Sequence, residues 1–169
     1  MHLRRCRAGD KRAVVAVLYD TFQSTWLPEI SEEAARAFRE EDRPERYFEA
    51  RGAQFWVAII EGDVAGFIDW EGDFINALHV RSAYARQGVG ASLLEHCEAQ
   101  IRLAGGRQAA LETDTFNTVA RAFYTRNGYV ETDRYPDTEW NSGLMTLRMV
   151  KRFTRPVTDR QTPPISSSV

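Results

Sequence analysis

The chain has 169 residues, with 22 Lys or Arg and 24 Asp or Glu, which give a formal net charge of −2. This length suits one domain with a sizeable core, and 43% hydrophobic and 27% charged residues are typical of a globular protein. The slightly negative charge argues against a protein that holds a nucleic-acid backbone, so we expect no nucleic-acid partner.

The cysteine content and the hydropathy pattern indicate the cellular compartment that we expect for this protein. Cys6 and Cys97 are far apart and lack metal-site spacing, so the sequence predicts neither a bound metal nor a disulfide framework. Two unclustered cysteines fit a reducing compartment. No stretch reaches 18 apolar residues, and the N-terminus lacks the apolar core of a signal peptide. We therefore expect a cytoplasmic protein with no membrane partner.

The N-terminal third of the chain predicts a short strand and two helical regions. Residues 2–7 form a candidate strand, and apolar residues recur at helical spacing over 10–22. A second helical region is expected to begin near Ser31, a residue type that caps helix N-termini, and to be divided at Pro44.

Three strand-like runs follow, rich in aromatic and β-branched residues, at 54–60, 64–70 and 74–80. The tripeptide Glu-Gly-Asp joins them at 61–63 and again at 71–73. Short connections that contain Gly are typical of hairpins, so the sequence predicts an antiparallel meander.

The second half alternates helical and strand patterns. We expect two helices and three strands there: a helix from Gly88 to the Gly105-Gly106 pair, then 108–114, 117–127, 129–135 and 143–151. The order of elements predicts the α/β class, as one mixed sheet with helices on both faces. Residues 154–169, rich in Pro, Ser and Thr, are expected to be a mobile tail or a strap on a partner, after a domain of residues 1–153.

The segment Arg-Gln-Gly-Val-Gly-Ala, at 86–91, opens a helix with few large side chains. Unpaired N–H groups at a helix N-terminus bind phosphate well, and Gly allows close approach. The chain has no P-loop and lacks the third glycine of the dinucleotide fingerprint. On this stretch alone, a plain helix cap explains the glycines equally well.

Two longer stretches carry a family resemblance. LHVRSAYARQGVGASLL resembles motif A of the GNAT superfamily of acyl-CoA-dependent N-acetyltransferases, and NTVARAFYTRNGY resembles motif B. Gly88, Val89 and Gly90 match the part of motif A that wraps the CoA pyrophosphate, whereas Ala85 stands where the motif has Gln or Arg. The resemblance spans roughly residues 3–151. The segment around Trp26 and the stretches DFINALHV and RYPDTEW together resemble an uncharacterised bacterial branch of this superfamily.

The resemblance implies the GNAT fold, with the central sheet splayed between strands 74–80 and 108–114. It also implies acetyl-CoA as co-substrate, without a metal. The residues that would contact CoA are Leu78, His79, Val80, Arg86, Gln87, Gly88, Val89, Gly90, Ala91, Asn117 and Tyr124. Asn117 would contact the pantetheine arm, cap the helix, or do both.

The resemblance also suggests catalytic residues. Tyr124 stands where motif B places a general acid, although a core tyrosine fits the same helical pattern. Glu112 stands where related enzymes hold the attacking water, although it is also compatible with an outward-facing charge. His79 competes for the role of base. A backbone N–H near Leu78 to Val80 would hold the oxyanion.

The expected function is acetyl transfer from acetyl-CoA to a primary amine of a small molecule or peptide. A non-catalytic CoA-binding regulatory module on the same fold is the alternative, and transfer of another acyl group or to oxygen is a third interpretation. Acidic residues around Trp70, at 69–74, suggest a cationic acceptor, although a polar hairpin explains them equally well. Residues 135–140 would approach the same cleft. The fold is compatible with a homodimer.

Overall fold

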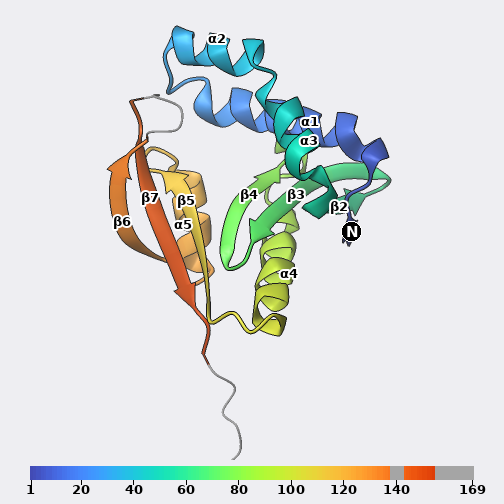
Figure 1. The fold of residues 1–169 in the computed structure, drawn as a ribbon, viewed down its shortest axis with the longest axis vertical. Helices are drawn as coiled ribbons and strands as arrows, with labels where there is room; N and C mark the ends of the chain where they lie inside the picture. The colour runs from blue at the N-terminus through green and yellow to red at the C-terminus, as the bar shows by residue number, and fades with distance from the viewer. Residues whose placement is uncertain (138–142, 155–169) are drawn as a thin grey trace, which may run out of the picture.

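One mixed sheet of seven strands organises the computed structural model, which describes residues 1–137 and 143–154. The strands follow the order β1-β2-β3-β4-β5-β7-β6 (Figure 1). Among the described residues, neighbouring strands are antiparallel except β4 and β5, which are parallel. The strands are β1 (His2–Arg5), β2 (Trp56–Ile60), β3 (Asp63–Glu71), β4 (Phe74–Val80), β5 (Gln108–Asp114), β6 (Val130–Pro136) and β7 (Met145–Arg152).

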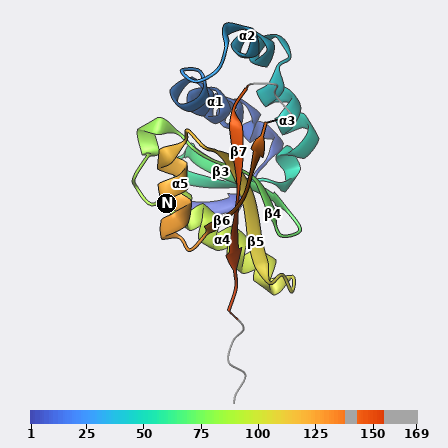
Figure 2. The same ribbon diagram turned by 90° about the vertical axis from the view of Figure 1, so that its left-hand side faces the viewer.

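Helices cover both faces of this sheet, which confirms the predicted class (Figures 1 and 2). Helices α1 and α3 lie on one face, while α4 and α5 lie on the other, with α2 above α1. A π-helical turn, η2 (Phe22–Trp26), prolongs α1. The α-helices of the described part are α1 (Lys11–Thr21), α2 (Glu32–Glu40), α3 (Arg43–Arg51), α4 (Val89–Leu103) and α5 (Thr118–Arg126). Residues 155–169 of the predicted tail lie outside the described residues.

The predicted helix boundaries have the expected local causes. Ser31 caps α2, because its side-chain oxygen accepts a hydrogen bond of 3.1 Å from the Ala34 N–H. Pro44 lies in the first turn of α3, where a missing N–H costs nothing, and so divides the helical region as expected. Asp42, with φ of 47°, adopts a left-handed conformation at the break.

The predicted meander is also confirmed. The β2–β3 turn places Glu61 and Gly62 at φ of 51° and 91°, as a two-residue type I′ hairpin requires. The β3–β4 turn is equally short, since Glu71 pairs with Phe74. Tight turns fix the register of these three strands, and therefore which side chains face which helix layer.

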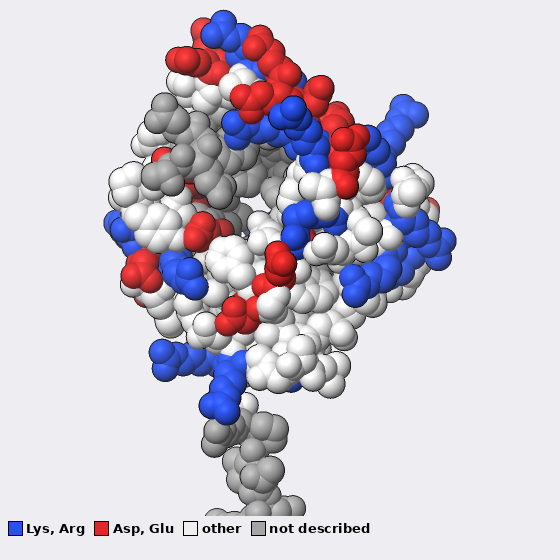
Figure 3. All heavy atoms as spheres, in the orientation of Figure 1, with Lys and Arg blue, Asp and Glu red and all other residues white. Residues whose placement is uncertain are grey.

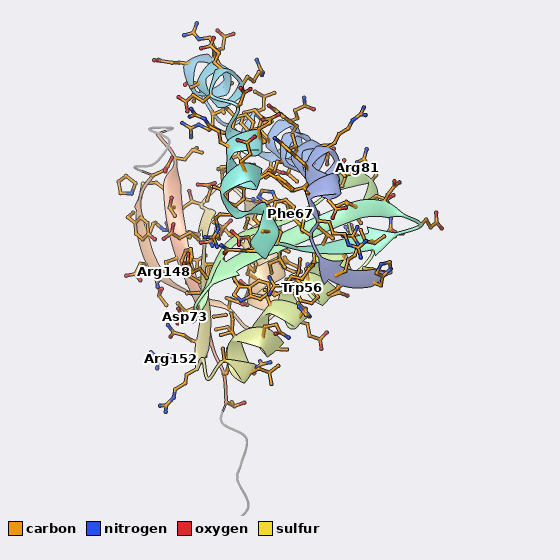
Figure 4. All side chains as sticks on the ribbon, turned by 45° about the vertical axis from the view of Figure 1, so that its right-hand side comes forward. Trp56, Phe67, Asp73, Arg81, Arg148 and Arg152 are labelled. Atoms are coloured by element: carbon orange, nitrogen blue, oxygen red, sulfur yellow. The ribbon has the colours of Figure 1, made fainter. Side chains whose placement is uncertain are left out.

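Two buried cores lie on opposite faces of the sheet. Between the sheet and helices α4 and α5, the core includes Ile68, Val89, Leu93, Cys97, Ile101, Leu111, Tyr124 and Met149. Between the sheet and helices α1 and α3, it includes Val14, Val17, Phe55, Val57 and Phe67. Figure 4 shows Phe67 beneath the helices of this second layer. Each of the two helix layers therefore packs against the sheet through its own apolar core.

Gly66 allows β3 and β4 to approach closely. A Cβ atom at this position would lie 2.5 Å from the carbonyl oxygen of His79 and 3.2 Å from the Cα of Val80. Any larger residue must push β4 away from β3, and β4 carries one wall of the site described below.

We therefore expect Gly66→Ala to lower the free energy of unfolding by about 1–3 kcal/mol, because the added methyl group overpacks a backbone contact. Urea unfolding monitored by tryptophan fluorescence measures the change. Gly9→Ala is the matched control, since a Cβ there has no atom within 4 Å. Equal midpoints for the two variants would contradict the prediction.

Candidate active site

The two parallel strands in the middle of the sheet separate soon after they meet. β4 and β5 pair only at Phe74–Ala110 and Ile75–Leu111. In Figure 4, Asp73 lies just before β4 at the paired end, and Arg81 follows β4 at the open end. The predicted splay between residues 74–80 and 108–114 is thus present, and it leaves backbone groups of β4 without a strand partner.

A β-bulge directs these backbone groups. Trp70 pairs with Ile75 and Asp69 with Ala77, so Asn76 is an extra residue in β4. The N–H of Arg81 donates to the carbonyl of Ala65 at 2.8 Å. Since hydrogen-bonded pairs alternate in an antiparallel ladder, the N–H groups of Leu78 and Val80 point away from β3 and into the splay.

A cavity of about 790 Å³ occupies this region. It lies between helices α1–α3 and strands β4–β7, and Figure 3 shows a hollow on this face of the molecule. The cavity brings together five of the residues that the sequence predicts as site residues: Leu78, His79, Glu112, Asn117 and Tyr124. Of the segment 135–140, Tyr135, Pro136 and Asp137 also line the cavity, while 138–140 lie outside the described residues.

Tyr124 enters the cavity from α5. Its side chain is buried, and burial, helped by the nearby Cys97, raises the pKa of its phenol well above the usual value. The hydroxyl makes no hydrogen bond to any other described residue. A protonated phenol without a protein acceptor is able to donate to a ligand atom in the cavity.

Asn117 caps the same helix. Its side-chain oxygen accepts a hydrogen bond of 3.1 Å from the Ala120 N–H, which satisfies one orphan donor of α5. Asn117 also lines the cavity. The structure therefore supports its capping role directly and leaves its side chain at the cavity wall.

Glu112 is exposed on β5 and faces the cavity. It accepts a hydrogen bond from the Tyr135 hydroxyl on β6. Burial, reinforced by this carboxylate, raises the pKa of Tyr135 to about 12. Arg148 on β7 stands opposite Glu112 in the ladder, and Figure 4 shows where it lies. The Glu112 carboxylate is thus exposed to solvent, as one interpretation expected, and it also lines the cavity.

His79 faces α1 and is held there. Thr21 Oγ1 lies 2.9 Å from the His79 Nδ1 and also lies within 3.1 Å of the carbonyls of Val17 and Leu18. Nδ1 and the Thr21 hydroxyl share a hydrogen bond whose direction depends on which imidazole nitrogen carries the proton. Burial lowers the pKa of His79 to about 4, and its ring stacks on Phe67 at 5.3 Å. The imidazole is neutral at pH 7.

Trp26 and Asp114 form a contact that the sequence did not predict. The indole N–H of Trp26 donates to Asp114 Oδ2 at 2.7 Å, and the indole ring lies 5.9 Å from the His79 ring. Trp26 thus reaches from η2 to both separated strands. Burial raises the pKa of Asp114. The only sequence signal was alternation, which places Asp114 on the same face of β5 as Glu112.

Of the acidic hairpin that the sequence suggested for acceptor binding, Asp69 is turned into the core. Asp69 is fully buried and ion-paired with Arg51, which also contacts Glu71. Trp70 packs toward α4, against His96 at 6.2 Å. Neither Asp69 nor Trp70 lines the cavity. Among the described residues, the acidic ones that line the cavity are Glu112 and Asp114 of β5 and Asp137, which follows β6.

The glycine-rich turn stands at the N-terminus of α4, beyond the end of β4. Gly88 has φ of 81° and open space where a Cβ would be, and Arg86 has φ of 63°. The first helical hydrogen bond runs from the Ser92 N–H to the Gly88 carbonyl. The N–H groups of the residues before Ser92 therefore have no helical acceptor: Val89, Gly90 and Ala91. Such a turn suits a phosphate group.

The remaining predicted residues of the turn support its shape. Gln87 donates from its side chain to the Ala83 carbonyl at 3.2 Å, which closes the loop. Gly90 faces inward, where a Cβ would lie 3.4 Å from the Phe123 ring and 3.6 Å from Val80. This close contact brings the start of α4 beside α5 and the end of β4.

A family model described as the acetyltransferase (GNAT) family matches residues 15–129, which is more than half of the chain. This chain belongs to that family. A curated relative, an uncharacterized N-acetyltransferase of Methanocaldococcus jannaschii, is 32% identical over 103 residues. That match covers 58% of this GNAT chain and 65% of the relative's own length.

Solved structures show the same GNAT fold. A GCN5-related N-acetyltransferase from Rhodopseudomonas palustris superposes with a TM-score of 0.77 at 22% identity, covering 90% of this chain and 95% of that one. The PaiA N-acetyltransferase of Thermoplasma acidophilum, solved in complex with coenzyme A, gives a TM-score of 0.73 at 21% identity, covering 90% and 98%. At these identities the likeness concerns the fold.

Residues 1–137 and 143–154 of the GNAT chain contain neither a candidate metal cluster nor a candidate membrane-spanning helix. No group of three or more His, Cys, Asp or Glu side chains is placed to hold a metal ion there. No helix in the same residues combines the length and apolar character needed to cross a bilayer.

The neutral His79 predicts a pH dependence of stability. Its pKa is about 4 when folded and 6.5 in its ordinary state, so the unfolded chain binds more protons between these values. The free energy of unfolding should therefore fall as the pH drops from about 6.5 to 4, by up to about 1.4 kcal/mol per unit. We expect His79→Gln to lose this part of the slope. Urea unfolding at pH 7 and pH 5 checks it, and an unchanged slope in the variant would contradict it.

Proposed function

We propose that this chain transfers the acetyl group of acetyl-CoA to a primary amine of a small molecule or peptide. The observation that carries the proposal is the splay itself. An unbonded buried phenol, free N–H groups of β4 and a carboxylate of β5 all face it, and an N–H-rich helix start stands at its open end. The Thermoplasma acidophilum neighbour was solved with coenzyme A, which supports the choice of co-substrate.

The residues present fit acetyl-CoA. The N–H groups at Val89, Gly90 and Ala91 would hold the pyrophosphate, with close approach allowed at Gly88. When bound, the co-substrate supplies an activated acetyl thioester. The N–H of Leu78 would donate to the acetyl carbonyl oxygen and stabilise the negative charge that develops there.

The reaction needs a proton acceptor and a proton donor, and side chains around the splay can serve as both. A lysine-like amine has a pKa near 10.4, so only about one in a few thousand is neutral at pH 7. Glu112 would take the proton from the attacking amine, directly or through a water. Tyr124 would donate its phenolic proton to the leaving thiolate, whose conjugate acid has a pKa of about 8.5.

His79 is the weaker candidate for the base. Burial lowers its pKa to about 4, and a group that acidic is a poor acceptor for an ammonium proton at neutral pH. Its Nδ1 is engaged by Thr21. We assign it to the wall that orients the acceptor, beside Trp26 and Asp114.

Ligand binding is the first test of the proposal. We expect acetyl-CoA and CoA to raise the melting temperature while ATP does not, because a site filled at about 100 times its Kd adds about 2.7 kcal/mol of stability. Gly90→Leu should lose the shift, since a larger side chain meets the Phe123 ring and closes the approach. An amine panel with thiol-release detection follows. Binding without transfer to any amine would favour the non-catalytic CoA-binding module.

Tyr124→Phe tests the acid. We expect kcat to fall by about 100-fold or more, because the proton donor is lost, while the Kd of acetyl-CoA stays within about twofold. Tyr129→Phe is the matched control: it also removes one buried hydroxyl, which is bonded to Glu98 outside the cavity. Unchanged turnover in Tyr124→Phe would remove Tyr124 from the mechanism.

A further inference from the structure

A fully buried carboxylate lies behind the site, on the strand next to β4. Asp69 of β3 is 0% exposed and does not line the cavity. An unpaired charge at such a position would be very costly in free energy. The groups that compensate it are therefore important for the local structure.

Asp69 accepts hydrogen bonds from three side chains. Arg51 donates from Nε to Oδ2 at 2.6 Å and from a terminal nitrogen to Oδ1 at 3.0 Å, in a bidentate pair. The Tyr47 hydroxyl donates to Oδ2 at 2.6 Å, and Asn76 Nδ2 donates to the same oxygen at 3.2 Å. Both carboxylate oxygens are therefore satisfied, and the charge is balanced by Arg51.

These partners join three elements at one point. Tyr47 and Arg51 belong to α3, Asn76 is the bulged residue of β4, and all three line the cavity. Asp69 itself is the residue of β3 that the bulge faces, through its pairing with Ala77. The carboxylate thus links the helix wall of the cavity to the place where β4 departs from regular pairing.

The bulge sets the direction of every later group in β4. Ile75 packs in the core beneath α4, whereas Ala77 packs in the core beneath α1, although residues two apart share a face in a regular strand. Without the extra residue, the alternation would be reversed. The Leu78 N–H would then point toward β3 and would be used in the ladder.

We propose that Asp69 is a positioning residue for acetyl transfer: by holding the side chain of Asn76 and helix α3, it fixes the bulge that turns the Leu78 N–H into the splay. This inference rests on the proposed function and adds to it a residue outside the cavity. Asp69 touches neither substrate, and it acts through Asn76 and Leu78.

Asn76 carries the kinetic test, because replacing the fully buried Asp69 would remove the shared acceptor of Arg51, Tyr47 and Asn76 at once and could unfold the chain. Asn76→Asp is nearly isosteric but loses the amide donor and places a second carboxylate beside Asp69. We expect kcat to fall by about 10- to 100-fold in Asn76→Asp and in Asn76→Ala, with the KM of acetyl-CoA within about twofold. Asn76→Gln, which keeps the donor, should retain more activity than either.

The matched control is Gln108→Ala. Gln108 donates one side-chain hydrogen bond of 3.0 Å to Asp73, at the paired end of β4 and β5. Its loss should leave kcat unchanged. Equal turnover of wild type, Asn76→Asp and Asn76→Ala would overturn the role of Asp69, even with acetyl transfer itself established.

An amide NMR readout separates this inference from the proposed function. In the wild type, acetyl-CoA should move the Leu78 amide resonance more than CoA does, because only acetyl-CoA carries the thioester carbonyl that would accept from this N–H. In Asn76→Asp that difference should disappear while the shifts of Gly88 and Gly90 remain. Retention of the Leu78 difference in the variant would overturn the inference alone. No shift at Gly88 and Gly90 in the wild type would overturn the proposed function and the inference with it.

Discussion

The early separation of β4 from β5 is the constraint on which the rest of the structure depends. Two parallel strands normally use their N–H and C=O groups on each other, and buried groups without partners are costly. Here pairing stops after Ile75 and Leu111, so the following backbone groups face a cavity. Such a gap is stable only if both sides are held independently. On one side β3 and the two cores hold β4, and on the other β7 pairs with β5 along its whole length.

The two faces of the sheet divide the chemistry. Tyr124 and the start of α4 reach the splay from the face that α4 and α5 cover, whereas Glu112, Asp114 and His79 reach it from the face of α1. A proton donor and a proton acceptor thus stand on opposite sides of the same opening. This arrangement suits a reaction in which one group enters as another leaves, because the two proton transfers need not share a site.

Burial favours the neutral form of the titratable groups Tyr124, Asp114 and His79 around the splay. It raises the pKa of Tyr124 and of Asp114 and lowers that of His79, and in each case the neutral form is favoured. The charged groups near the site are instead compensated, as Asp69 is by Arg51. Among the described carboxylates that line the cavity, Glu112 on β5 is the one in the exposed class.

Much of the fold could be predicted from local patterns, because those patterns report local physics. Alternating apolar residues, two Glu-Gly-Asp turns, the Ser31 cap and Pro44 specify elements within a few residues of themselves, and the two GNAT-like motifs identified the family. The positions of Gly88 and Tyr124 followed from the same motifs.

What only the tertiary structure decided were contacts between residues far apart in the chain. The bulge at Asn76 depends on how β4 meets β3, and it changed the interpretation of Asp69 from an acceptor-binding residue to a buried ion-pair partner. Trp26 meets Asp114 across 88 positions. No local pattern encodes either contact, because strand register and helix docking are set by packing of the whole core. The sequence by itself determined the elements and the family, and packing decided which side chains face the splay.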